Sequence, residues 1–261
     1  MDAGVTGSFL LQYPQGNHNA YDTNAAHDKK DCRQCQGELS PAVGPGPHDL
    51  ACLTERSSQR YTVRMLACIL LAAGQSRRFG KPKAVTDING RPLIQLLQET
   101  VLAAGCEELI VVLGARSEEI EPLLLNHSRV NVVHNKDHKF GQTSSFQCGL
   151  RQLSKAVTGV WLLPVDYPFL CRATLLRLSE ILSQHPADIV IPTFDGKRGH
   201  PPLFPADLID EFLALDPGLG LNTVQHRHRD RCRDCPVDDP GVIATFNTPA
   251  ELLAWRAKLK L

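Results

Sequence analysis

The sequence lacks a hydrophobic run long enough to cross a membrane, because nowhere do about 18 apolar residues follow one another. It also lacks a net charge, since 28 Lys and Arg balance 28 Asp and Glu. Its first residues lack the basic segment and apolar core of a secretory signal. We therefore expect no membrane and no nucleic acid among its partners, and a cytoplasmic location.

A disulfide framework is missing as well, because the nine cysteines are odd in number and irregularly spaced. Without a secretory signal, reduced thiols are their expected state. Cys32 and Cys35 have the spacing of half a zinc site, but a single C-x-x-C pair is a weak signal. Free thiols are the preferred interpretation.

The chain divides by composition into residues 1–64 and residues 65–261. The first part is rich in Gly, Pro, Asn, Asp, Gln and Ser and has no helical or strand periodicity. We predict that residues 1–64 are a disordered extension, which an upstream misassigned start codon would also explain. Residues 65–261 are predicted to form one folded domain.

Short apolar runs alternate with amphipathic segments in residues 65–261, which indicates an α/β fold with a mostly parallel sheet. Right-handed crossovers then place the carboxyl ends of the parallel strands along one edge. The predicted strands are 66–70, 109–113, 130–134, 160–165, 189–192 and 242–246, and the predicted helices are 92–104, 117–125, 144–153, 173–183 and 250–260.

A glycine- and cation-rich stretch, residues 71–83, follows the first predicted strand. In open α/β sheets, ligands bind at the carboxyl ends of strands. Gly74 and Gly80 allow the backbone to approach a ligand, and Ser76 can donate to anionic oxygens. A solvated basic turn is the alternative, but the position after a first strand favours a polyphosphate site. The cations of this loop are Arg77, Arg78, Lys81 and Lys83.

The common phosphate-binding motifs do not describe this loop. Five residues separate Gly74 from Gly80 where a P-loop has four, and Pro82 follows Lys81 where a P-loop needs Ser or Thr. The stretch contains no G-x-G-x-x-G pattern either.

The pattern Leu71-Ala72-Ala73-Gly74-x-Ser76-x-Arg78-Phe79-Gly80, ending in Lys83, resembles the signature of the MobA-like nucleotidyltransferases. The likeness is greatest to the molybdenum cofactor cytidylyltransferases, and it extends from about Met65 to the C-terminus. It implies a Rossmann-like three-layer nucleotidyltransferase fold. It also implies nucleotide binding by residues of this loop: Leu71, Ala72, Ala73, Gly74, Ser76 and Lys83.

Asp166 ends the fourth predicted strand and therefore lies at the same sheet edge as the Gly74 loop. A carboxylate beside a polyphosphate calls for a cation between them, and Mg²⁺ takes one or two carboxylates together with phosphates. The Asp-x-Pro turn also resembles the metal-binding turn of the family. We therefore predict Asp166 as a Mg²⁺ ligand.

Asn247 precedes the terminal helix, where Asn is a good capping residue. The resemblance adds a second role, because relatives carry Asp or Asn here as the second metal ligand. The two roles are compatible.

Two further turns have both a structural and a functional interpretation. Gly141, Ser144 and Ser145 match a family turn that contacts the nucleotide, and helix N-termini favour anions, but a plain capping box fits equally well. Arg198 and His200 resemble the family's Arg-Gly-His-Pro turn and would hold the phosphate and pterin of the acceptor. A β-hairpin tip explains that turn equally well.

The segment 226–235 departs from the family pattern. Its H-x-H-x-x-x-C-x-x-C spacing could supply zinc ligands, but its interleaved arginines oppose a dication. We predict a basic surface loop that contacts the acceptor.

The predicted reaction is nucleotidylyl transfer, in which an acceptor phosphate attacks the α-phosphate of a nucleoside triphosphate and pyrophosphate leaves. Lys83, Arg78 and the Mg²⁺ on Asp166 and Asn247 would neutralise the triphosphate. By resemblance, the donor is CTP, the acceptor is molybdenum-bound molybdopterin, and a molybdenum hydroxylase would receive the product. The alternatives are a guanylyl, sugar-phosphate or other metabolite nucleotidylyltransferase, and a non-catalytic molybdenum cofactor chaperone.

Overall fold

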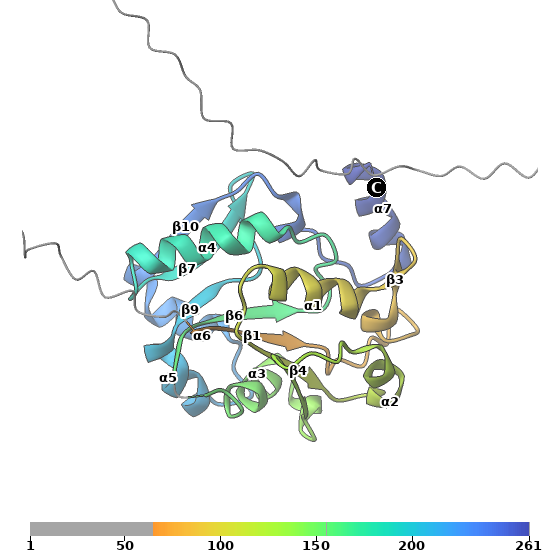
Figure 1. Ribbon diagram of the computed structural model, residues 1–261, viewed down its shortest axis with the longest axis horizontal. Helices are drawn as coiled ribbons and strands as arrows, with labels where there is room; N and C mark the ends of the chain where they lie inside the picture. Colours follow the sequence, from red (N-terminus) through yellow and green to blue (C-terminus); the bar gives the residue numbers. More distant parts are fainter. Residues whose placement is uncertain (1–64, 155, 261) are drawn as a thin grey trace, which may run out of the picture. The chain divides into compact units, whose positions relative to one another are not determined.

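The computed structural model describes residues 65–154 and 156–260 (Figure 1). The expected extension at residues 1–64, with its Cys32-x-x-Cys35 pair, lies outside the described residues. None of the helices in the described part of the chain is long and apolar enough to cross a membrane.

A mostly parallel sheet of eight strands forms the centre of the fold, in the order β10-β7-β9-β6-β1-β4-β5 with β8 paired to β7. Strand β1 pairs in parallel with β4 and β6, whereas β9 runs antiparallel between β6 and β7. Strands β2 (Asp87–Ile88) and β3 (Arg91–Pro92) form a separate small hairpin. The sheet strands are β1 (Met65–Leu71), β4 (Glu108–Leu113), β5 (Val130–His134), β6 (Val157–Pro164), β7 (Ile189–Phe194), β8 (Lys197–Arg198), β9 (Leu203–Pro205) and β10 (Cys232–Pro236).

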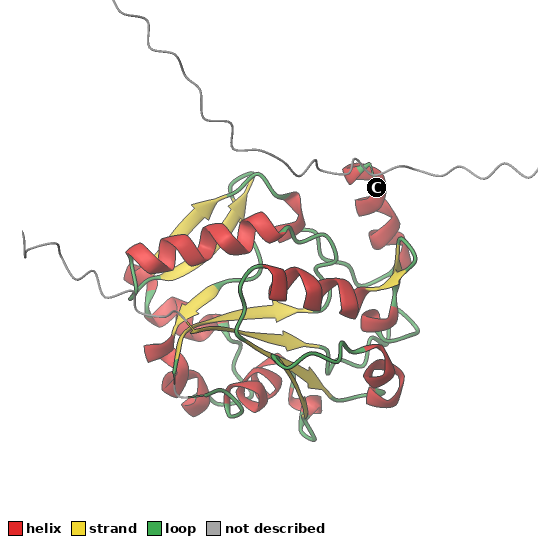
Figure 2. Ribbon diagram, viewed as in Figure 1, coloured by secondary structure: helices red, strands yellow, loops and turns green. Residues whose placement is uncertain are grey.

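Helices cover both faces of the sheet, which gives the expected three layers (Figure 2). Helices α1 and α4 pack on one face, and α3, α5 and α6 pack on the other. Alternate β1 side chains serve the two cores: Cys68 and Leu70 belong to the first, and Ile69 and Leu71 to the second. The helices are α1 (Leu93–Ala103), α2 (Ser117–Ile120), α3 (Gln142–Leu150), α4 (Arg172–Gln184), α5 (Ile209–Ala214), α6 (Asn222–Arg227) and α7 (Pro249–Leu259).

Helix α3 lies close against strand β1 because Gly149 faces the strand. A Cβ atom on Gly149 would lie only 2.5 Å from Cγ2 of Ile69. The N-terminus of α3 is thereby held near the carboxyl end of β1, where the Gly74 loop begins.

The sequence predicted the parallel strands and most of the helices, but one strand prediction is wrong. Residues 242–246 do not join the sheet: a 3-10 helix spans Pro240–Val242, and the chain then continues without regular structure. The carbonyl of Val242 instead accepts a hydrogen bond from the His200 N–H at 2.8 Å. The predicted helix 117–125 is also shorter, because α2 ends at Ile120 and a 3-10 turn follows.

The segment 226–235 is not a loop, which corrects that prediction. It contains the end of α6, a 3-10 turn and the edge strand β10, which pairs in parallel with β7. Cys232 packs with the core on one face of the sheet and Cys235 with the core on the other. Since they point to opposite faces, these two thiols cannot share a zinc ion.

Candidate active site

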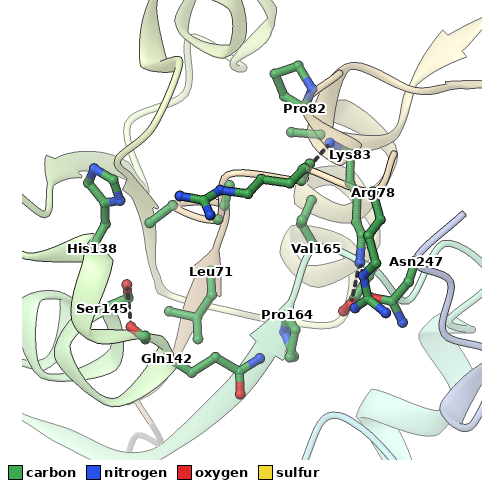
Figure 3. A pocket seen from close by; sticks show the side chains of 18 residues that line it. Leu71, Arg78, Pro82, Lys83, His138, Gln142, Ser145, Pro164, Val165 and Asn247 are labelled. Carbon is green, nitrogen blue, oxygen red and sulfur yellow. Dashed lines mark hydrogen bonds and ion pairs between the residues drawn. The ribbon is translucent and has the colours of Figure 1, made fainter. Parts of the chain in front are cut away.

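A cavity of about 300 Å³ opens at the carboxyl ends of β1 and β6 (Figure 3). Its position is the one expected for a ligand site in an open α/β sheet. The lining residues are Leu71, Ala72, Ala73, Gly74, Ser76, Arg77, Arg78, Pro82, Lys83, Ala84, His138, Gly141, Gln142, Ser145, Pro164, Val165, Asp166 and Asn247.

The Gly74 loop is shaped by two residues in the left-handed region, Ser76 at φ 48° and Gly80 at φ 81°. The hydroxyl of Ser76 accepts a hydrogen bond from the Lys83 N–H at 3.2 Å. This bond closes the loop on itself and directs the Lys83 side chain into the cavity. Of the four cations of this loop, Arg77, Arg78 and Lys83 line the cavity, whereas Lys81 lies outside its lining.

Lys83 is the centre of a polar cluster at one end of the cavity. Its Nζ donates to Oδ2 of Asp166 at 2.9 Å and to Oδ1 of Asn247 at 3.1 Å. Arg78 Nη2 also donates to Oδ1 of Asn247, at 3.2 Å. The Lys83 ammonium lies 5.3 Å from the ring centroid of Phe246. Residues from three distant parts of the chain therefore meet here, as the sequence predicted.

The cluster is only partly open to water, which strengthens its electrostatics. The side chains of Lys83 and Asp166 are 12% and 22% exposed. Two cations and one carboxylate share the cluster, so its formal charge is positive. A polyphosphate is the ligand that would compensate this charge.

The opposite end of the cavity holds no carboxylate among the described residues. Figure 3 shows His138, Gln142 and Ser145 there, with Leu71 between them and the cluster around Lys83. Nδ1 of His138 is buried and has no hydrogen-bond partner among the described residues. Sequence reasoning singled out the turn at Gly141 but not its neighbour Gln142, and it missed His138, which belongs to no recognised motif.

The hydroxyls of Ser144 and Ser145 are engaged within the protein. Each accepts a hydrogen bond from Nδ2 of Asn135 at 3.0 Å, and each donates to the carbonyl of Gly141. Ser145 lines the cavity, whereas Ser144 lies behind it. These bonds hold the first turn of α3, and they leave Gly141 and Gln142 to face the cavity.

The two expected acceptor residues differ in their exposure to solvent, and neither belongs to the cavity lining. Arg198 lies on the exposed β7–β8 hairpin and pairs with Asp234 on β10 at 2.6 Å. His200 is largely enclosed: its ring stacks on Tyr167, with centroids 4.7 Å apart, next to Asp166 in sequence. Burial lowers the pKa of His200, so the imidazole is neutral at physiological pH.

The chemistry of the cluster suits a hard divalent cation. The Asp166 carboxylate and the Asn247 amide oxygen converge on one positive charge, the Lys83 ammonium. Mg²⁺ and Mn²⁺ favour oxygen ligands of these two kinds, completed by substrate phosphates. The residues present therefore fit a metal site shared with a polyphosphate.

Comparison with known proteins places the chain in a family. Residues 68–232 match the MobA-like NTP transferase domain. The chain is 32% identical over 148 residues to the nicotine blue oxidoreductase of Paenarthrobacter nicotinovorans, covering 54% of this chain and 71% of that protein. It is 29% identical over 195 residues to the molybdenum cofactor guanylyltransferase of Cupriavidus metallidurans, covering 70% and 91%. It spans only 30% of the bifunctional GlmU protein of Bartonella quintana.

Solved structures share the fold. Rv0371c of Mycobacterium tuberculosis superposes with a TM-score of 0.64 at 23% identity, over 76% of this chain and 99% of that one. A nucleotidyl transferase of Methanothermobacter superposes with a TM-score of 0.63 at 24% identity, over 75% of this chain and 98% of that one. A manganese complex of Rv0371c gives 0.54 at 22% identity, over 66% and 88%.

The family match covers the Gly74 loop, Asp166 and the turn before α3, and the solved structures share the sheet that brings these parts together. The chain belongs to the MobA-like NTP transferase family and is a nucleotidyltransferase.

Proposed function

We propose that the protein transfers CMP from CTP to the terminal phosphate of a molybdopterin-type acceptor and releases pyrophosphate. The observation that carries this proposal is the two-ended cavity, with the cationic cluster of Lys83 and Arg78 at one end and the hydrogen-bonding side chains of His138 and Gln142 at the other. The triphosphate fits the first end by charge, and the base fits the second by its hydrogen-bonding groups.

In this reaction an oxygen of the acceptor phosphate forms a bond to the α-phosphorus. The bond from that phosphorus to the bridging oxygen breaks, and pyrophosphate carries away the electron pair. The nucleophile is already anionic, so no general base is required. Lys83 and Arg78 bind and neutralise the triphosphate, and Ser76 holds the loop that positions it.

Asp166 and Asn247 are the residues that would hold a divalent cation, Mg²⁺ or Mn²⁺. When bound, such an ion neutralises negative charge on the phosphates as a Lewis acid. The name of the manganese complex above supports a divalent ion of this class. His200, beside Asp166, and Arg198 remain the proposed contacts for the acceptor.

GTP is the second candidate donor, and the name of the Cupriavidus relative favours it. The leucine-alanine-alanine-glycine form of the loop, at residues 71–74, favours CTP by resemblance to the cytidylyl branch. The same cavity would also serve a sugar-phosphate or other metabolite as the acceptor. The name of the Paenarthrobacter relative suggests oxidoreductase activity as another alternative. A chaperone that binds the molybdenum cofactor without reaction is the non-catalytic alternative.

One experiment separates these candidates. The protein is incubated with each of the four nucleoside triphosphates labelled at the α-phosphate, with Mg²⁺ or Mn²⁺, and with molybdenum-bound molybdopterin or a panel of sugar phosphates. We expect label transfer to molybdopterin and an equal release of pyrophosphate, fastest with CTP. Transfer only from GTP would replace the donor, transfer only to a sugar phosphate would replace the acceptor, and binding without transfer would support the chaperone.

A further inference from the structure

The Lys83 ammonium occupies the position between the two oxygens that would hold the metal. Its Nζ lies 2.9 Å from Asp166 Oδ2 and 3.1 Å from Asn247 Oδ1. Both distances are those of charge-assisted hydrogen bonds rather than loose approaches. A divalent cation can reach these two oxygens together only after Lys83 has moved away.

Arg78 adds a second cation on the same side. Its Nη2 donates to the same Asn247 oxygen that Lys83 uses. Two cations and one carboxylate therefore surround the position of the proposed metal ion. Asn247 is neutral, whereas an aspartate there would supply a second negative charge. A bare dication entering this partly buried position meets net repulsion.

We propose that Lys83 is a tethered placeholder that excludes bare metal ions from the Asp166–Asn247 site until a nucleoside triphosphate draws its ammonium away. This inference rests on the proposed function, since it assigns to that site a coupling between the two ligands. The phosphates attract Lys83 and Arg78 away from the Asp166 and Asn247 oxygens, which then become free to bind the metal ion. The phosphates also supply the negative charge that stabilises the ion. Metal and nucleotide then bind together, and each raises the affinity for the other by the same factor.

If Lys83 excludes the metal ion, then replacing Lys83 should increase the affinity for metal, although Lys83 lines the cavity. The experiment titrates the purified full chain with Mn²⁺ alone, in the absence of nucleotide and acceptor, and measures free Mn²⁺ by electron paramagnetic resonance. We expect Lys83→Met to bind Mn²⁺ at least about tenfold more tightly than the wild type. Asn247→Asp should also tighten binding, because it adds a carboxylate.

Lys81→Met is the matched control, because Lys81 belongs to the same loop but lies outside the cavity lining. Its Mn²⁺ affinity should equal that of the wild type. Lys83→Gln is the second variant: it removes the charge and keeps a donor for Asp166, should Lys83→Met fail to fold. Thermal melting identifies the folded variants.

Equal or weaker Mn²⁺ binding by the folded Lys83 variants would overturn the placeholder. Because the titration needs no turnover, its outcome is independent of the transfer reaction. Absence of transfer from every nucleotide would overturn the proposed function and leave the Mn²⁺ result standing.

Discussion

The hydroxyl of Thr248 caps helix α7, and this leaves the amide of the preceding residue, Asn247, free to face the cavity. Thr248 Oγ1 accepts from the Glu251 N–H at 3.3 Å, while the Asn247 N–H donates to the Glu251 carboxylate at 2.7 Å. The pair resembles a capping box, except that the Glu251 carboxylate binds the N–H of Asn247, before the cap, and not that of Thr248 itself. The sequence predicted Asn247 as a cap as well as a ligand, but the structure gives the cap to Thr248.

The first prediction concerns Asp166, the only carboxylate in the cavity lining among the described residues. Asp166→Asn should lower kcat/KM for nucleotidylyl transfer by at least about a hundredfold, because it removes the negative charge of the proposed metal ligand beside the phosphates. Steady-state kinetics at a fixed Mg²⁺ concentration measures the loss. Asp195→Asn, on the exposed β7–β8 turn, is the control. Wild-type turnover by folded Asp166→Asn would remove the residue from the mechanism.

The second prediction concerns His138, whose buried Nδ1 has no partner among the described residues. The imidazole ring also lines the cavity, so a nucleobase held there would contact it, and His138→Phe should weaken nucleotide binding about three- to tenfold. Binding of tripolyphosphate, which has no base, should not change. His138→Asn, which can keep a polar atom near Nδ1, should recover part of the affinity.

Isothermal titration with the nucleotide and with tripolyphosphate makes this comparison directly. His185→Phe is the control, because His185 is exposed at the end of α4. If His138→Phe weakens both ligands equally, the imidazole supports the cavity wall and does not contact the base.

The third prediction concerns pH and His200. Burial lowers the pKa of His200. The hydrogen bond to the Leu162 carbonyl and the charge of Asp166 raise it, but their effect is smaller. The unfolded chain therefore binds a proton more readily than the folded one. The free energy of unfolding is thus greatest above the unfolded pKa of about 6.5 and falls as the pH drops toward the folded pKa.

His200→Phe should remove this part of the pH dependence while keeping a ring against Tyr167. Urea denaturation between about pH 5 and pH 7.5 compares the two proteins, and the wild-type curve should be the steeper one. Parallel curves would show that His200 does not titrate on unfolding.

The fourth prediction concerns residues 1–64. Their sequence lacks the periodic apolar pattern of a packed segment, and the family match begins only at residue 68. Deletion of residues 1–64 should therefore change neither kcat/KM nor Tm appreciably. A clear fall in Tm would show that these residues contribute to the folded domain.

The elements that the sequence predicted well carry a local signal. Strand β1 is a continuous apolar run, and the loop after it combines glycines with cations, so both its position and its chemistry could be inferred. Asp166 was placed correctly because a carboxylate directly after a buried strand must lie at the carboxyl edge of the sheet.

The elements that the sequence missed depend on partners far along the chain. Strand β9 has three residues, too few to show a period, and is fixed by β6 and β7 on either side. Strand β10 has a charged sequence because it is an edge strand, and Arg233 pairs with Asp188 at 2.5 Å. The apolar sequence of residues 242–246 resembles that of a buried strand. These residues are instead buried as an irregular segment that packs against the rest of the domain.

The wall near Ala73 is tightly packed, which bears on the choice of base. Ala73 is 3% exposed and lies against Gly114, where an added Cβ would come within 2.9 Å of the Ala73 methyl and 2.8 Å of the His138 Cβ. The Ala73 carbonyl accepts from the Ala115 N–H at 3.2 Å, which fixes the backbone. A larger base therefore cannot gain room by moving this wall.

The last prediction follows from that packing. Ala73→Gly removes the methyl group and should raise kcat/KM for GTP relative to CTP, because a purine needs more space at this end of the cavity. A size difference of one methyl group is worth about 1–3 kcal/mol, so the wild type should retain some activity with GTP. Both donors are measured with one acceptor preparation, and Ala103→Gly, at the exposed end of α1 and outside the cavity lining, is the control. If the wild type prefers GTP, the proposed donor CTP is wrong, whereas the proposed nucleotidylyl transfer reaction still holds. An unchanged ratio in Ala73→Gly would show that the base is selected elsewhere in the lining, which also holds His138 and Gln142.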